Sequence, residues 1–454
     1  MDLIVEAAMD ESRPTVAVSA PGKVLLAGGY LVLDRKHSGL VLGLSARINV
    51  AAGAIHTSEG VQLNEIVVDS PQFVEAQWRY GYHRAPEDGG IKVTQLQVGC
   101  RFSPNRFIET TLCYALTYID CLAGRPSQHK ITPARLVVLA DNDYYSPASS
   151  THPHAPSSSR FAHMGVRLAD AHKTGLGSSA ALVTALTAAL LSHYLPTAAF
   201  DLSTPPGRRI LHTLAQAAHC AAQAKLGSGF DVAAAVYGSC LYRRFSPDLL
   251  AALADPGTAG FGASLASLVD SQSWDMDIQP LPPLPPGLSL RMCDVDCGSH
   301  TVAMAKQLLA WRARDPPVSE PLWDKLQRAN HHLAALLAQP SPSPDLSSAI
   351  AAIRHLLRTM AQLSGVPIEP PSQTQLLDAL TTQVQGVYGG VVPGAGGYDA
   401  LALLVRDDPD TASSIASFLS QWSKDTGTRV RLLSAIGQHH GARSESLDVY
   451  AGWL

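Results

Sequence analysis

The stretch Lys173-Thr174-Gly175-Leu176-Gly177-Ser178-Ser179-Ala180-Ala181 opens a long apolar helical pattern. Its two glycines let the backbone turn tightly and approach a ligand closely. The two serines begin the helix, where free N–H groups and the positive end of the helix dipole form an anion site. A hydroxyl group at this point can also bind Mg²⁺ beside a phosphate. The stretch therefore indicates a phosphate-binding loop, with a lysine adding positive charge at its entrance.

Two interpretations of this stretch remain open when it is considered alone. Its spacing differs from that of a Walker A loop, because Lys173 precedes the glycines instead of following them. The alternative to a phosphate site is a plain helix start that is capped by serines.

Three further glycine-rich segments contain charged residues. Ser19-Ala20-Pro21-Gly22-Lys23 places a lysine between a predicted Pro-Gly turn and an apolar strand. Pro393-Gly394-Ala395-Gly396-Gly397 has more glycine than a hairpin needs, which suggests backbone packed against a ligand or another loop. Gly227-Ser228-Gly229-Phe230-Asp231 follows a helix and presents an aspartate. The respective alternatives are a surface lysine, a plain hairpin loop and a helix N-cap.

The pattern of apolar residues predicts an α+β fold, with short runs as strands and patterns of helical period as helices. The expected strands are 15–19, 23–27, 30–33, 39–44, 135–140, 288–295, 387–392, 400–405 and 429–433. The expected helices are 106–122, 179–195, 208–225, 300–314, 321–337, 346–364 and 409–424.

We expect two lobes with a proline-rich connection. The N-terminal domain would span residues 1–250, the linker 251–286 and the C-terminal domain 287–454. Residues 142–165 are rich in serine and proline, so they are expected to form an exposed flexible loop. This loop is either a mobile lid over the site or a tolerated surface insertion.

Composition favours a compact metabolic protein. The 454 residues are 46% hydrophobic and carry a formal net charge of −4 without a basic stripe, so we expect no nucleic-acid partner. No apolar run reaches the length of about 18 residues that suggests a membrane span, and no signal peptide is recognisable. The seven cysteines lack C-x-x-C spacing, which favours reduced thiols and a cytoplasmic location. The seventeen histidines lack metal-site company and are expected in solvated loops.

Taken together and in this order, the glycine-rich segments resemble the motifs of the GHMP kinases. Residues 19–23 resemble the N-terminal A-P-G-K motif of that family, and residues 175–180 its phosphate-binding motif. Residues 393–397 resemble its C-terminal motif, so the resemblance covers nearly the whole chain. It implies a two-lobed fold in which ATP and a phosphate acceptor meet in the cleft between the lobes.

Within this superfamily the chain most resembles the fungal and plant phosphomevalonate kinases. Gly28-Gly29-Tyr30-Leu31-Val32-Leu33-Asp34 is similar to them, although most GHMP kinases have a glutamate where this chain has Gly29. Gly365-Val366-Pro367-Ile368-Glu369-Pro370 and Gly298-Ser299-His300-Thr301 are also similar, although His300 stands where we expect a small residue. The implied reaction converts ATP and 5-phosphomevalonate into ADP and 5-diphosphomevalonate, in the mevalonate pathway of isoprenoid and sterol biosynthesis.

The resemblance also implies roles for individual residues. A phosphate acceptor, whose second pKa is about 6, is already largely ionised at neutral pH, so positioning and charge neutralisation matter more than a base. The expected catalytic residues are Lys23, Lys173 and Asp231, with the aspartate orienting a lysine or Mg²⁺. The expected nucleotide contacts are Gly175, Leu176, Gly177, Ser178, Ser179 and Ala180, with Ser178 also binding Mg²⁺. The expected acceptor contacts are Ser299, Thr301, Arg354, Arg358, Gln373 and Gly396.

Several alternatives remain open. The two arginines, one helical turn apart, could instead form a solvated helix face. A GHMP kinase for mevalonate or a sugar would need a base to remove a hydroxyl proton. A catalytically silent nucleotide sensor has no need to keep Lys23, Lys173, Ser178 and Asp231 together. A purely structural or interaction protein does not explain the glycine clusters beside charged residues. We expect a monomer or homodimer that uses ATP and Mg²⁺.

Overall fold

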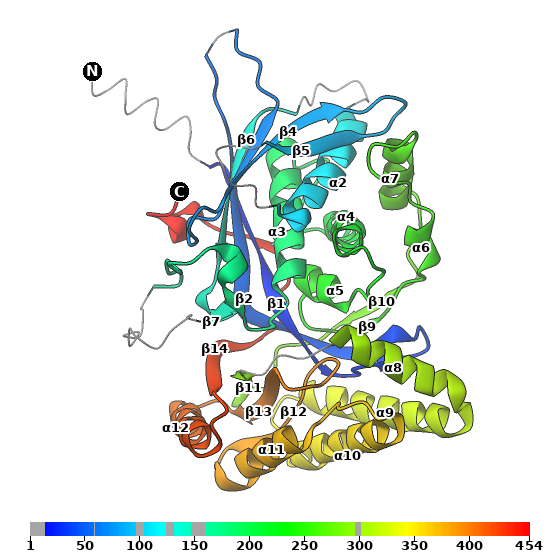
Figure 1. Cartoon of the computed structure of the whole chain (residues 1–454), viewed down its shortest axis with the longest axis vertical. Helices are drawn as coiled ribbons and strands as arrows, with labels where there is room; N and C mark the ends of the chain where they lie inside the picture. The colour runs from blue at the N-terminus through cyan, green and yellow to red at the C-terminus, as the bar shows by residue number, and fades with distance from the viewer. Residues whose placement is uncertain (1–13, 59, 97–103, 124–130, 147–158, 296–300) are drawn as a thin grey trace.

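The computed structural model describes residues 14–58, 60–96, 104–123, 131–146, 159–295 and 301–454. In Figure 1 the N-terminal lobe lies above the C-terminal lobe, with strands running between them. This arrangement confirms the predicted α+β fold with two lobes. Most of the predicted 142–165 loop, residues 147–158, lies outside the described residues, so the choice between lid and surface insertion stays open.

One long strand organises the sheet. β2 (Gly39–Ala54) pairs along one edge with β1 (Val16–Ala27). Its other edge is shared by three strands in turn, β9 (Cys240–Arg243), β14 (Val430–Gln438) and β6 (Ala134–Ala140). Because β14 also pairs with a strand of the C-terminal lobe, a single sheet of 13 strands passes through both lobes.

The upper part of the sheet continues from β6 and is covered on one face by helices (Figure 1). The remaining strands of this part are β3 (Glu65–Asp69), β4 (Gln77–Arg84), β5 (Ile91–Leu96) and β10 (Asp277–Pro280). The helices are α2 (Arg106–Ala123), α3 (Ser178–Tyr194), α4 (Pro205–Gln223), α5 (Phe230–Tyr237), α6 (Asp248–Ala251) and α7 (Phe261–Asp270). α3 packs directly on β1 and β2, and its alanine- and leucine-rich sequence suits burial on nearly all sides.

The C-terminal lobe carries five helices around the lower end of the sheet (Figure 1). Its strands, besides β14, are β11 (Leu288–Val295), β12 (Val387–Val391) and β13 (Ala400–Arg406). Its helices are α8 (Thr301–Arg314), α9 (Pro316–Leu337), α10 (Leu346–Ser364), α11 (Pro371–Gln383) and α12 (Pro409–Thr426). Every helix predicted for this region is present, and α11 is an addition that the sequence pattern did not reveal.

The chain then returns to the N-terminal lobe. β15 (Arg443–Ser444) pairs with β1, and the 3-10 helix η4 (Leu447–Tyr450) buries Tyr450 beside Val137 of β6. Residues 251–286, expected to be a linker, contain α7, whose Phe261 is fully buried in the core. The domain limits at residues 250 and 287 stay predictions. The segment between them packs into the core and is more than a simple connection.

Two local expectations were wrong. Pro21 and Gly22 do not form a turn, because β1 runs through them with only a shift of register between Pro21 and Lys23. A proline is tolerated at such an irregularity, where the ladder needs no N–H donor. Residues 30–33 were expected to form a strand, but Leu31–Leu33 is a 3-10 helix, η1. The positive φ of 96° at Gly28 turns the backbone just before it.

A buried arginine joins the returning segment to the sheet. Arg47 of β2 is 1% exposed, and its Nε donates to the hydroxyl of Ser19 at 2.6 Å. Its two terminal nitrogens donate to the side chain of Gln438 and to the carbonyl of Gly441. Burial lowers the pKa of Arg47 to about 10, so the guanidinium stays charged at neutral pH. Its charge is faced by Glu445, with 3.8 Å between Nε and Oε1.

We predict that Arg47→Met lowers the free energy of unfolding by about 3–5 kcal/mol, because it leaves buried acceptors without their donor and Glu445 without its buried counter-charge. Urea denaturation measures this loss. The control is Arg443→Met, which removes a 42% exposed side chain that contacts the same Glu445 and should cost at most about 1 kcal/mol. Equal losses in the two variants would contradict the role assigned to burial.

Candidate active site

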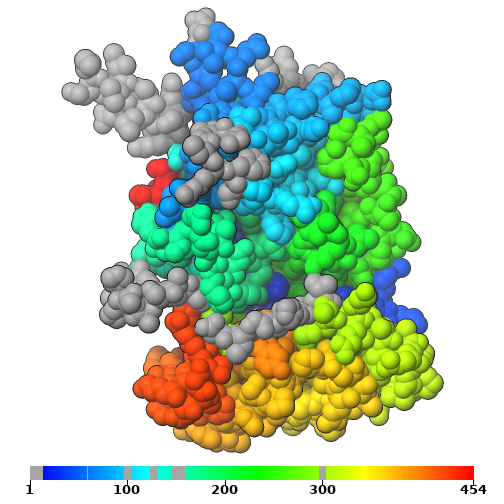
Figure 2. All heavy atoms as spheres, in the orientation of Figure 1, coloured from blue at the N-terminus to red at the C-terminus, as the bar shows by residue number. Residues whose placement is uncertain are grey.

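The free edge of β1 holds two glycine-rich loops. Near its start this edge pairs with β15, at Val18 and Ser19. Farther along, the N–H of Lys23 donates to the carbonyl of Leu176 at 2.9 Å. Two residues later, the carbonyl of Leu25 accepts from the N–H of Gly394 at 3.0 Å. Figure 2 shows dark-blue atoms from this early part of the chain at the floor of a hollow between the lobes.

The first of these loops, residues 174–177, leads into the N-terminus of α3, which no described side chain caps. Gly175 and Gly177 both have positive φ, 73° and 85°, which is why these two positions require glycine. Gly177 is the N-cap of α3, and no side-chain hydrogen bond caps the helix among the described residues. The loop is held from behind by Thr174, whose hydroxyl donates to the carbonyl of Asp143 at 2.6 Å. The first N–H groups of α3 are therefore available to an anion.

Lys23 crosses directly over this helix start. A Cβ atom placed on Gly177 would lie 2.8 Å from Cε of Lys23, so only glycine leaves room for the lysine. The ammonium group lies 5.4 Å from the centre of the Phe230 ring. Burial lowers the pKa of Lys23, and the negative charge of Asp231 partly opposes that shift. The lysine thus sits between the start of α3 and the start of α5.

Asp231 stands in the first turn of α5, a second helix whose N-cap is a left-handed glycine. Gly229 has φ 87°, and no side chain caps the helix within the described part of the chain. The preceding loop is fixed by Tyr242, whose hydroxyl donates to the carbonyl of Ser228 at 2.8 Å. Arg244 donates to the carbonyl of Gly227 at 2.9 Å. The side chain of Asp231 is 25% exposed and so can reach a ligand.

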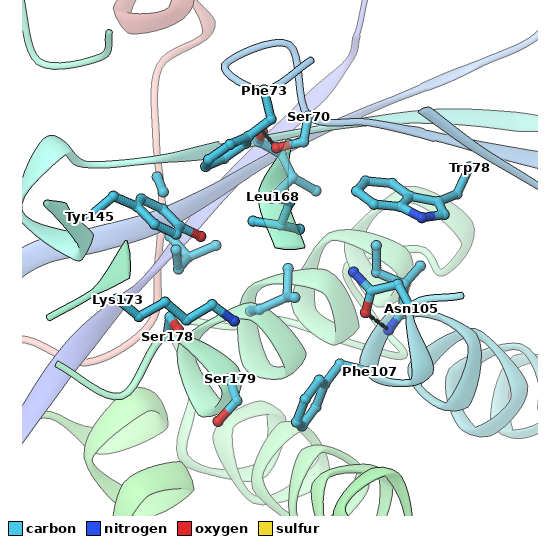
Figure 3. A pocket seen from close by; sticks show the side chains of 15 residues that line it. Ser70, Phe73, Trp78, Asn105, Phe107, Tyr145, Leu168, Lys173, Ser178 and Ser179 are labelled. Atoms are coloured by element: carbon cyan, nitrogen blue, oxygen red, sulfur yellow. Dashed lines mark hydrogen bonds between the residues drawn. The ribbon is translucent and has the colours of Figure 1, made fainter. Parts of the chain in front are cut away.

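An apolar pocket adjoins the start of α3 and encloses about 640 Å³, including its open mouth. Figure 3 shows the aromatic side chains around it and the amine of Lys173 reaching across it above Ser178 and Ser179. The aromatic residues are Phe73, Trp78, Phe107 and Tyr145. They come from three separate parts of the chain, so sequence patterns did not reveal the pocket.

Lys173 lies on β8 (His172–Lys173), which pairs with β7 (Tyr145–Ser146) as a small separate sheet. Its side chain is exposed. The structure therefore brings Lys23, Lys173 and Asp231 around the two helix starts, together with the glycine-rich loop that begins α3. Of the residues described, none forms a cluster of three or more histidines, cysteines or carboxylates that could hold a metal ion by itself.

The C-terminal glycine-rich loop, residues 393–397, packs its backbone closely against the backbone of two other segments. A Cβ atom on Gly29 would lie 2.5 Å from the carbonyl oxygen of Gly394, so a glutamate at this position is excluded by the loop. Tyr30 fixes the same loop by donating to the carbonyl of Ala395 at 2.5 Å. Gly396, expected to contact the acceptor, packs so closely on Ile368 that a Cβ atom would lie 2.2 Å from its carbonyl oxygen.

The expected acceptor contacts on the helices of the C-terminal lobe have other partners. Arg354 is 6% exposed and donates to Glu369 and to Asp378, both at 2.7 Å. Arg358 donates to Glu369 at 3.1 Å. Carboxylates thus engage both guanidinium groups, and the buried Arg354 does not form the alternative of a solvated helix face, while the phosphate clamp stays a prediction.

The remaining acceptor candidates are placed only in part. Gln373 is buried, and its amide nitrogen donates to the carbonyl of Tyr398 at 2.7 Å at the end of the C-terminal glycine loop. Ser299 lies outside the described residues, and Thr301 is the first residue of α8. The expectation of solvated histidines also fails for His212 and His219, which are buried in α4.

Comparisons with known proteins give matches along the chain. The GHMP kinases N terminal domain matches residues 164–239, and the GHMP kinases C terminal domain matches residues 334–425. A phosphomevalonate kinase of Gibberella zeae is 59% identical, covering 98% of this chain and 100% of that protein. One from Aspergillus fumigatus is 44% identical, covering 96% and 98%.

A solved structure shares the fold. The Streptococcus pneumoniae phosphomevalonate kinase, in complex with phosphomevalonate and AMPPNP, aligns with a TM-score of 0.59. The alignment covers 93% of this chain and 99% of that chain at 18% sequence identity. This structural likeness supports the fold. The sequence identity to the Gibberella zeae and Aspergillus fumigatus phosphomevalonate kinases shows the family. The chain belongs to the phosphomevalonate kinase family of the GHMP kinases.

Proposed function

We propose that this protein transfers the γ-phosphate of ATP to the phosphate of 5-phosphomevalonate, giving ADP and 5-diphosphomevalonate. The observation that carries the proposal is the position of Lys23 between two uncapped helix starts, those of α3 and α5. Bringing two polyanions together is the main difficulty of such a reaction. A buried ammonium group and two positive helix ends address it by neutralising charge.

The nucleotide has a site of matching chemistry. Its phosphates suit the N–H groups at the start of α3, and the flat aromatic faces of its base suit the aromatic pocket beside Lys173. The loop backbone at residues 175–177 would wrap the phosphates, while Lys173 would neutralise the transferred group. Ser178 and Ser179 supply hydroxyl groups at the same point.

The donor groups present also fit Mg²⁺ that arrives with ATP. This ion is usually held by one or two carboxylates together with substrate phosphates and water, and Ser178 and Asp231 would be its protein ligands. When bound, Mg²⁺ would supply charge neutralisation between the phosphates.

The acceptor needs little acid–base help from the protein. Its phosphate oxygen is already ionised at neutral pH, so Asp231 would orient Lys23 instead of removing a proton. The proposed acceptor contacts are Ser299, Thr301, Gln373 and the backbone near Gly396.

A location in the cytoplasm and a monomeric or homodimeric state are further parts of the proposal. Five described cysteines without disulfide bonds agree with a reducing compartment. None of the helices in the described ranges combines the length and apolar character that a membrane crossing needs.

The direct test is ADP release by the purified protein with Mg·ATP, offered 5-phosphomevalonate, mevalonate and galactose in parallel. We expect turnover with 5-phosphomevalonate alone. Turnover only with mevalonate or galactose would sink the proposed acceptor while keeping the kinase fold. Tight ATP binding without any turnover would favour a nucleotide sensor.

Lys173→Met should lower kcat by at least about 100-fold, because the transferred phosphate loses a neutralising charge in the transition state. Steady-state kinetics measure the change. The control is Lys424→Met, which removes a lysine at the end of α12 and should leave kcat within twofold. A Lys173→Met variant that kept near-normal kcat/KM would contradict the charge-neutralisation account.

The pH profile of kcat/KM tests Lys23. Because burial lowers the pKa of Lys23, its charge should be lost on the alkaline side at a pH below the usual lysine value of about 10.4. Activity should therefore fall as pH rises through that pKa. Lys23→Arg keeps its charge at all these pH values and should abolish this alkaline limb, whatever its overall rate. An unchanged limb in this variant would assign it to another group.

A further inference from the structure

His219 lies beside the proposed site and contacts both Asp231 and Ser179. It belongs to α4 and is 3% exposed. Its Nδ1 lies 3.7 Å from a carboxylate oxygen of Asp231, and its Nε2 lies 3.1 Å from the hydroxyl of Ser179. The amide nitrogen of Gln223 also lies 2.7 Å from Nε2, and the ring of Phe107 packs nearby, with centroids 5.9 Å apart.

These contacts assign the protons of the ring. The amide nitrogen of Gln223 can only donate, so Nε2, which lies 2.7 Å from it, is the acceptor, and the ring hydrogen lies on Nδ1, which faces Asp231. In a neutral ring with hydrogen on Nδ1, Nε2 is an acceptor. The amide of Gln223, at 2.7 Å, and the hydroxyl of Ser179, at 3.1 Å, therefore share the single lone pair of Nε2.

We propose that His219 is a positioning residue, which holds the Ser179 hydroxyl and the Asp231 carboxylate in one fixed arrangement. The proposal rests on the proposed function, because it concerns the same site. With its proton directed to Nε2, Ser179 keeps both oxygen lone pairs for the space above the start of α3. The nucleotide side and the aspartate side of the site are thus joined through one imidazole.

The same helix supplies a natural control. His212 lies two turns earlier in α4 and is fully buried, but neither ring nitrogen has a hydrogen-bond partner among the described residues. It packs against the rings of Tyr237 and Trp274. Burial lowers the pKa of His212 to about 3, so it stays neutral. Losing His212 removes a buried imidazole from α4 without removing a hydrogen bond to Ser179 or to Asp231.

The test compares His219→Gln with His219→Asn. The amide of glutamine can occupy the position of Nε2 and accept from Ser179, whereas the shorter asparagine reaches only the position of Nδ1. The readouts are kcat, the Michaelis constants for ATP and for the acceptor, and the Kd of a non-hydrolysable ATP analogue without Mg²⁺. Thermal melting checks the folding of each variant.

We expect His219→Asn to lower kcat at least tenfold and to weaken analogue binding at least fivefold. The Michaelis constant for the acceptor should change less than threefold in both variants. His219→Gln should keep analogue binding within threefold, and His212→Leu should keep kcat within twofold of the unchanged protein.

Equal losses in His219→Gln and His219→Asn would overturn the proposal, because a packing role does not distinguish them. A loss in His212→Leu as large as in His219→Asn would do the same. If the unchanged protein turns over none of the acceptors, the proposed function fails by itself. The Kd of the analogue then still decides whether His219 positions Ser179.

Discussion

The outer edge of β1 is the constraint on which the site depends. An exposed strand edge presents unpaired N–H and carbonyl groups, which proteins normally cover or pair. Here β15 pairs with the first part of this edge, and two loops, rather than another strand, bond to the residues near Lys23. The carbonyl of Leu176 and the N–H of Gly394 are those partners. These two loops come from opposite lobes. Each is held near Lys23 by a direct backbone hydrogen bond to the strand.

The two lobes are joined by sheet as well as by contact. β14 pairs with β11 in the lower lobe and with β2 in the upper lobe, so backbone hydrogen bonds cross the boundary. Asp143 adds a side-chain link, accepting from both the N–H and the hydroxyl of Ser434. A shared sheet resists rotation of one lobe against the other more than a flexible connection does. The cleft geometry around Lys23 is therefore largely preformed.

The sequence predicted those parts of the site whose chemistry is local. Left-handed glycines such as Gly177 and the helix that follows it are encoded within a few residues, and so is Asp231 at the start of α5. Features made by distant segments escaped prediction. Trp78 lines the pocket only because β4 pairs with β3 and β5 in the same sheet as β6, and Arg354 is paired only because α10 packs near Glu369. Periodicity carries no information about such partners, and the strands of residues 65–96 were missed for the same reason.

The C-terminal segment that returns to the upper lobe is synthesised last, and this order affects how the protein folds. Arg47 is made 391 residues before Gln438, one of the groups that its guanidinium contacts. On the ribosome the upper lobe can collapse around α3 early. The edge of β1 and the guanidinium of Arg47 gain their partners, β15 and Gly441, only near the end of translation. Nascent chains of this protein would thus hold an incomplete upper lobe through most of their synthesis, a window in which chaperones have an exposed strand edge to shield.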